Sequence, residues 1–122
     1  MKWTLLITLM VLAISVSASA QDPAKVDPKH YKVVYEDASV RLLRITLGPK
    51  EKTVMHEHPG GCAINITDVH AKTTLPDGKV STSDGKAGEG SCSTTTTRHQ
   101  QENTSDKPIE VYQLELKPTK KP

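Results

Sequence analysis

Short β-rich runs alternate with turn signals along this chain, and this spacing constrains its fold more than any other feature. Val, Ile, Leu, Tyr and Thr dominate the runs, while Gly, Pro, Asp and Asn separate them. No run keeps a helical apolar period for the length that a helix needs. The sequence therefore predicts an all-β domain, either a sandwich or a small barrel.

The turn signals divide the chain into nine expected strands. We expect these strands over residues 31–35, 40–47, 53–58, 62–67, 70–75, 79–82, 91–97, 98–103 and 109–116. Pro76-Asp77-Gly78 is a strong turn signal between two of them. At Pro59-Gly60-Gly61 we expect glycine to supply a positive φ, which it adopts at little steric cost.

The first 20 residues have the pattern of a secretory signal peptide. Lys2 precedes an apolar stretch over residues 5–16, and small residues follow at 17–20. Since the apolar stretch is shorter than the roughly 20 residues that span a bilayer, we expect cleavage, no membrane association afterwards, and a periplasmic or secreted protein. The expected divisions are a signal peptide (1–20), a polar lead-in (21–30), a barrel domain (31–117) and a basic tail (118–122).

The charge balance gives no case for nucleic-acid binding. Lys and Arg number 16 against 14 Asp and Glu, and they form no strongly basic stretch of the kind that binds phosphates. Without its signal peptide the chain contains no Trp or Phe, so Val, Ile, Leu and Thr must build the core. A domain this small buries a modest fraction of its surface, which makes a homodimer plausible.

Three histidines carry the candidate chemistry. His56-Glu57-His58 places two imidazoles at positions i and i+2, which share one face of a strand. Two such rings can converge on one ion, and His99 is a third candidate ligand. Taken alone, each signal is weak, because histidines on strand ends are also common on surfaces.

The order and spacing of these histidines resemble the cupin superfamily. His56 and His58 match the His-x-His of the family's first motif, and Gly88, His99 and Asn103 occupy the Gly, His and Asn positions of its second motif. The resemblance extends through the flanking strands and covers nearly all of the chain after residue 20. It implies a small cupin-type β-barrel, a double-stranded β-helix of jelly-roll type.

The chain departs from the cupin motifs at several positions. Lys50 stands where the first motif begins with Gly, and Thr94 and Thr96 replace the Pro and Gly of the second. The family's glutamate ligand is missing, because Cys62 or Ala63 falls at its position. The resemblance thus implies a three-histidine site for one divalent transition metal ion (iron, zinc, copper, nickel or manganese), with coordination positions open to a small molecule.

Three functions are consistent with this resemblance. The first is a metal-dependent enzyme of oxygenase or isomerase type, since similar cupins include three-histidine dioxygenases acting on thiols. The second is a module that binds a small ligand or metal without turnover. The third is a degenerate cupin that has lost its metal, because one fold hosts many activities.

Further residues are assigned by strand parity and by composition. Gln101 and Asn103 share the parity of His99, so we expect both to face a substrate. Cys62 has three interpretations: a metal ligand, half of a disulfide with Cys92, or core filler.

Two expectations concern charged and polar side chains outside the motifs. Arg44 and Glu115 each share parity with apolar neighbours, and we expect them either to pair inside the barrel or to lie where their strands emerge into water. His30, before the first strand, is expected at the surface.

Overall fold

The computed structural model describes residues 21–118, so the predicted signal peptide and residues 119–122 of the predicted tail lie outside the described residues. Within this range no helix has the length and apolar character needed to cross a membrane. The elements are α1 (Pro23–Val26), β1 (Tyr31–Glu36), β2 (Val40–Leu47), β3 (His56–His58), β4 (Gly61–Asn65), β5 (Val69–Thr74), β6 (Val80–Gly85), β7 (Gly90–Ser93), β8 (Thr97–Asn103) and β9 (Ile109–Leu116).

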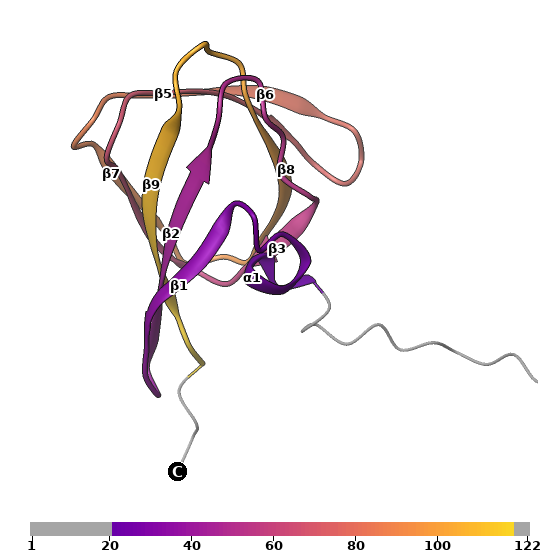
Figure 1. Cartoon of the computed structure of the whole chain (residues 1–122). Coiled ribbons are helices and arrows are strands. Elements are labelled where there is room, and N and C mark those ends of the chain that lie inside the picture. The colour runs from indigo at the N-terminus through magenta and orange to yellow at the C-terminus, as the bar shows by residue number, and fades with distance from the viewer. Residues whose placement is uncertain (1–20, 119–122) are drawn as a thin grey trace, which may run out of the picture.

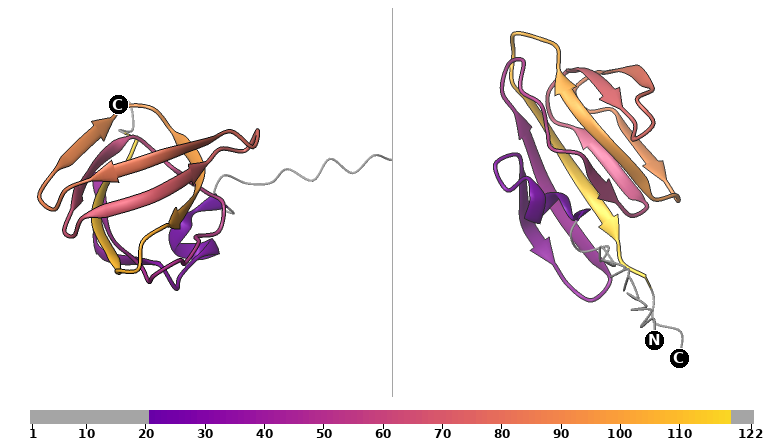
Figure 2. Two further views of the ribbon diagram at one scale, coloured as in Figure 1. Left: turned by 90° about the horizontal axis from the view of Figure 1, so that it is seen from above. Right: turned by 90° about the vertical axis from the view of Figure 1, so that its right-hand side faces the viewer.

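Two antiparallel sheets form the barrel (Figure 1). The strand order is β1-β2-β9-β4-β7 in the five-stranded sheet and β3-β8-β5-β6 in the four-stranded sheet. Seen from above, the strands of both sheets surround a common interior (Figure 2, left). The all-β prediction is therefore confirmed, and the expected ranges of β2 and β9 agree with the structure at both ends.

The polar lead-in contains a helical turn that the sequence analysis missed. The Asp22 carboxylate accepts a hydrogen bond from the Ala24 amide at 3.0 Å, and Pro23 occupies the first turn of α1. An Asp cap followed by Pro is a known helix start. Helices were predicted from the periodic spacing of apolar residues, and a single turn such as α1 is too short to show that spacing.

The core lies on the inner face of the five-stranded sheet. Alternate residues of β2 point inward, and Leu43, Ile45 and Leu47 are buried there with Ile109 of β9. Ala71 of β5 approaches from the other sheet. Burial of a Leu or Ile side chain stabilises a fold by about 1.5–3 kcal/mol, so this small cluster anchors β2 and β9 as the rigid wall of the barrel.

The glycines of the turn at residues 59–61 serve close packing, and the expected positive φ is wrong. Among the described glycines, the left-handed φ values occur at Gly78 (87°) and Gly88 (85°). A Cβ on Gly61 would overlap the Leu114 carbonyl oxygen of β9. Gly61 thus lets β4 approach β9 just after the chain has crossed from one sheet to the other, which fixes the end of β3.

Candidate metal centre

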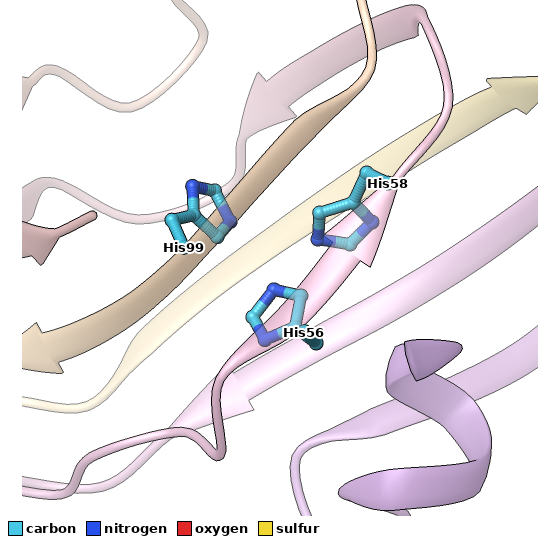
Figure 3. A group of neighbouring side chains, drawn as sticks. All are labelled: His56, His58 and His99. Carbon is cyan, nitrogen blue, oxygen red and sulfur yellow. The ribbon is translucent and has the colours of Figure 1, made fainter. Parts of the chain in front are cut away.

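Strands β3 and β8 bring the three predicted histidines together. His56 lies directly opposite His99 in the antiparallel register, and His58 follows two residues later on the same face of β3. Figure 3 shows the three rings directed toward one another. Their ring centroids are 4.6–5.4 Å apart, and one nitrogen from each lies within 4.8 Å of the others.

The backbone selects the tautomer of His56, which is fully buried. Its Nδ1 lies 2.7 Å from the Val54 carbonyl oxygen. Because a carbonyl only accepts hydrogen bonds, Nδ1 carries the hydrogen and Nε2 keeps its lone pair. The Tyr31 hydroxyl lies 3.0 Å from this Nε2 and donates to it.

Glu115 orients His58 from the outer side. Its carboxylate lies 2.9 Å from His58 Nδ1 and is 2% exposed. Arg41 donates to the same carboxylate at 2.7 Å, and Asp22 in turn accepts from Arg41 at 2.7 and 2.9 Å. A carboxylate behind a histidine fixes the ring and leaves Nε2 available, which is the usual support of a metal-ligating imidazole.

Of the two alternatives for Arg44, pairing with Glu115 inside the barrel is wrong, and the water-exposed position is the one observed. Glu115 is buried as predicted, but its partner is Arg41, the residue directly opposite it in the β2–β9 register. Arg44 instead binds Glu110 at 2.8 Å on the outer surface. The sequence of β2 has apolar residues at both parities, so the inward face could not be assigned from the pattern alone.

Burial keeps His56 and His99 neutral. Desolvation, followed by the neighbouring imidazoles, lowers the pKa of His99 to about 3 and that of His56 to about 4. Desolvation also raises the pKa of the Tyr31 hydroxyl far above its usual range, so the phenol keeps its proton. Neutral imidazoles with free lone pairs are the form that binds transition metals.

A cavity of about 330 Å³ in the barrel interior adjoins the histidines, and His58, His99 and Tyr31 form part of its wall. The other lining residues are Ile45, Leu47, Ala63, Asn65, Val69, Ala71, Ser83, Asp84, Gly85, Ser91, Gln101, Ile109, Val111 and Gln113. The wall thus combines aliphatic side chains with amides, hydroxyls and one carboxylate, and such placed polar groups can orient a small molecule. A second hollow of about 300 Å³ around Arg41 and Glu115 contains none of the three histidines.

Comparison with known proteins supports the fold assignment. No family model and no curated protein matches the sequence. Among solved structures, a cupin domain from Bordetella pertussis covers 72% of this chain and 92% of its own, with a TM-score of 0.67 and 20% identity. The fold is that of the cupins. An RmlC-like cupin family protein with a double-stranded β-helix fold from Methanocaldococcus jannaschii covers 70% of this chain and 77% of its own at 16% identity and TM-score 0.57.

A third similar structure is the Cupin_2 domain of an XRE family transcriptional regulator from Enterobacter cloacae. It covers 73% of this chain and 96% of its own, at 18% identity and a TM-score of 0.54. At such identities the likeness concerns the fold alone. The cupin barrel predicted from the histidine spacing is therefore confirmed, and activity must be argued from the site.

Lys50 is one of the departures from the cupin motifs, and its backbone conformation is unusual for a lysine. It stands at the position of the first motif's Gly and has a φ of 61°, in the left-handed region that favours glycine. The backbone at this position thus has a conformation that glycine adopts readily, although the residue is lysine. Lys50 also donates from Nζ to the Thr104 carbonyl oxygen, which holds the lysine in place.

The structure corrects the expectation for Asn103 and places Gln101 as expected. Gln101 lines the cavity beside His99. Asn103 has the same parity but lies beyond the cavity, where its amide donates to the Lys107 carbonyl at 2.7 Å and accepts from the Ser105 hydroxyl at 2.8 Å. Asn103 therefore organises the turn before β9, because its polar atoms are engaged by that turn.

Cys62 forms a disulfide with Cys92, so the structure leaves no thiolate to ligate a metal. The two cysteines lie directly opposite each other on β4 and β7. Ala63, the next residue, lines the cavity, and because side chains alternate along a strand, Cys62 points outward. Of the three interpretations of Cys62 that the sequence left open, the disulfide with Cys92 is the one observed.

His30 is buried, and its expected surface position is wrong. Its ring is held between Asp27, 2.8 Å from Nδ1, and Glu51, 2.7 Å from Nε2. His70, by contrast, is exposed and bonded to Asp84 at 2.8 Å, as expected of a strand surface residue.

The contact of Tyr31 with His56 was not predicted from the sequence. Its position at the start of β1 gave no signal, because β1 pairs only with β2 and the contact with His56 crosses the barrel. The role of Arg41 was missed for a different reason, since β2 allowed two inward faces. Arg41 lies directly opposite Glu115 in the pairing of β2 with β9. Knowledge of that register would have identified Arg41 as the partner of Glu115.

Proposed function

We propose that this cupin binds one divalent transition metal ion through His56, His58 and His99, and that the ion acts on a small molecule in the adjoining cavity. One observation carries the proposal: three imidazoles converge, and the Nδ1 atoms of His56 and His58 are already bonded to oxygen atoms. Their Nε2 atoms are thereby left to face a common point. A degenerate cupin would have no need to preserve this arrangement.

Three imidazole ligands fit a metal such as iron, zinc, copper or nickel. Manganese is the fifth metal to be tested. Three protein ligands leave positions for water or substrate. When bound, such an ion supplies Lewis acidity or, for iron and copper, oxygen activation. Glu115 holds the His58 ring, and the Val54 carbonyl holds the His56 ring. Glu115 is buried, and both bonds are present without an ion, so the two rings are preorganised before the ion arrives.

The cavity wall favours an uncharged small molecule as substrate. Among the described residues the wall contains neither Lys nor Arg, so a carboxylate or phosphate would find no cationic side chain there and only the ion itself to pair with. Its one carboxylate, Asp84, has a side chain that is 60% exposed and already bonds His70. Gln101, Gln113 and Asn65 supply donors and acceptors beside aliphatic side chains. We therefore infer a compact substrate with an apolar body and one or two polar groups.

Ligand binding without turnover is the second candidate. It is favoured by the scarcity of acid–base groups, because Asp84 is the only carboxylate in the wall and is mostly exposed. General acid–base catalysis would need a group placed within hydrogen-bond reach of the substrate. Redox chemistry at a metal needs no such residue, so dioxygen consumption separates the two candidates.

Metal analysis is the first experiment. The protein is purified without chelator or affinity histidines, beside a His56→Ala/His99→Ala double variant and a His70→Ala control. We expect about one metal per chain in the wild type and in the control, and loss of metal in the double variant. An oxygen electrode then measures uptake by the iron-loaded protein with panels of uncharged thiols and alcohols. No transition metal in the wild type after anaerobic reconstitution would sink the proposal.

We also propose export and a homodimer. The signal-like residues 1–20 and the Cys62–Cys92 disulfide support an oxidising, periplasmic or secreted location. Fractionation with intact-mass analysis should find a chain that begins near Gln21. The small size of the barrel supports the dimer, and light scattering of the mature protein tests it.

A further inference from the structure

Tyr31 contacts the proposed metal site and lies outside both cupin motifs. It is 3% exposed and lies against two of the histidines, with ring centroids 4.7 Å from His56 and 5.7 Å from His58. It also forms part of the cavity wall. A tyrosine here therefore faces both the proposed metal ligands and the space for the small molecule.

The hydroxyl of Tyr31 uses the lone pair that a metal would need. His56 Nδ1 donates to the Val54 carbonyl, so Nε2 is the acceptor in the 3.0 Å contact with Tyr31. One lone pair cannot serve a phenol hydrogen and a metal ion together. Metal binding at His56 and the Tyr31–His56 hydrogen bond are thus mutually exclusive.

Once Nε2 is occupied, the Tyr31 hydroxyl needs another acceptor. A buried hydroxyl without a partner is unfavourable, and the His58 side chain is already bonded through Nδ1 to Glu115. The buried Thr53 hydroxyl beside Tyr31 already accepts from the Gln101 amide, so we infer that the new acceptor comes from the cavity side, which Tyr31 lines. An electron-rich atom of a molecule held at the metal site meets this need.

We propose that Tyr31 competes with the metal for His56 and, when displaced, donates its hydrogen bond to the small molecule or anion held at the site. Tyr31 is then a positioning and selectivity residue, which lowers metal affinity while it raises affinity for an electron-rich ligand. This inference rests on the proposed metal site. It adds a role for a residue that lies outside both cupin motifs.

The test compares wild type with Tyr31→Phe, which removes only the hydroxyl. Tyr35→Phe is the matched control, because the Tyr35 hydroxyl makes a bond of similar length, 2.9 Å to Asp37, on the exposed surface. Zn²⁺ affinity is measured by competition with a chromophoric chelator. Azide affinity of the Co²⁺-loaded protein is measured from its visible spectrum, and circular dichroism checks the fold of each variant.

We expect Tyr31→Phe to bind Zn²⁺ about two- to ten-fold more tightly, as loss of one competing hydrogen bond implies. We expect it to bind azide several-fold more weakly, while Tyr35→Phe matches wild type in both assays. Zn²⁺ affinity that is unchanged or lower in Tyr31→Phe, or unchanged azide affinity, overturns the role of Tyr31 while the metal site stands. A wild-type protein that takes no metal overturns the proposed function as well.

Discussion

Two buried histidine clusters lie close together in this barrel and differ in the partners of their ring nitrogens. In the first, His30 has Asp27 on one ring nitrogen and Glu51 on the other. In the second, His56 and His58 each have a backbone or carboxylate oxygen on Nδ1. The clusters are neighbours, because Asp27 also accepts from the amide of Val54, whose carbonyl holds His56.

The difference shows that burial alone does not identify a metal ligand. Each His30 nitrogen is engaged by a carboxylate oxygen, so neither is available to bind an ion. His30 therefore ties the lead-in to the segment before β3. His56 and His58 each keep one nitrogen without hydrogen near His99, and that of His56 accepts from Tyr31. The partners of the ring nitrogens thus separate the structural histidine from the candidate ligands.

Replacement of His30 by alanine is expected to give the largest change in stability. It leaves Asp27 buried beside an empty space, and loss of one partner from a buried pair costs about 3 kcal/mol. Metal content should stay at the wild-type level, because no proposed ligand is touched. Urea unfolding measures the loss, and His70→Ala, at an exposed pair, should stay within about 0.5 kcal/mol of wild type. Equal stability of both variants would mean that the His30 cluster is not structural.

Replacement of Glu115 by glutamine is expected to act on the metal instead. The amide can no longer act as a charged acceptor for His58 Nδ1, and such changes behind a ligand weaken metal binding about 10–100-fold. Glu110→Gln is the control, because Glu110 lies on the same strand and pairs with Arg44 outside the barrel. Chelator competition measures both. Unchanged affinity in Glu115→Gln would remove Glu115 from the support of the site.

The two clusters should respond to acid in different pH windows in the metal-free protein. The pKa values of His56 (about 4) and His99 (about 3) lie below the usual 6.5, so the unfolded chain takes up protons first. Their stabilisation is complete above about 6.5 and is lost as the pH falls toward 3. Hydrogen bonds from His30, Lys29 and the backbone lower the pKa of Glu51 from 4.5 to about 2. Its contribution is complete above 4.5 and is lost between 4.5 and 2.

Urea midpoints measured from pH 8 to pH 2 test these windows. His99→Gln should flatten part of the decline between pH 6.5 and 3, and Glu51→Gln should flatten the decline below 4.5. If either variant followed the wild-type curve throughout, its group would not be coupled to folding.

The smallest effect is expected at Lys50, which precedes Glu51. Its left-handed φ of 61° costs a non-glycine residue about 1 kcal/mol, and Lys50→Gly removes that cost. The variant also loses the bond to the Thr104 carbonyl, so the net gain should stay below about 1 kcal/mol. Thermal unfolding measures it, with Lys32→Gly on β1 as a control that should destabilise. A loss of stability in Lys50→Gly would mean that the side-chain bond outweighs the backbone strain.

The sequence predicted the features that depend on local pattern. Turn residues marked the strands, and strand parity put His56, His58 and Gln101 on the inner side. Parity with Ile109 and Val111 pointed to an inward Glu115 on β9, and Glu115 is buried, although the other face of β9 is also partly apolar. On β2 both faces carry apolar residues, so parity suggested Arg44 as a possible partner, whereas the partner of Glu115 is Arg41.

Features that depend on contacts across the barrel could not be predicted. The burial of His30 depends on Glu51, 21 positions away along the chain. The Tyr31–His56 bond joins residues 25 positions apart on strands of different sheets. No pattern of neighbours encodes such pairs, so the convergence of the three histidines was predicted and most of the contacts that hold them were not.

The Cys62–Cys92 disulfide also bears on the ligand cavity. Strand β7 is an edge strand of the five-stranded sheet, paired with β4 alone, and its residues are exposed along their whole length. Yet Ser91 of this strand forms part of the cavity wall. The disulfide thus joins this edge of the pocket wall covalently to β4. A thiol reductant that opens it would loosen the wall at Ser91 without touching a histidine, so we expect any small molecule held there to be retained better under oxidising conditions.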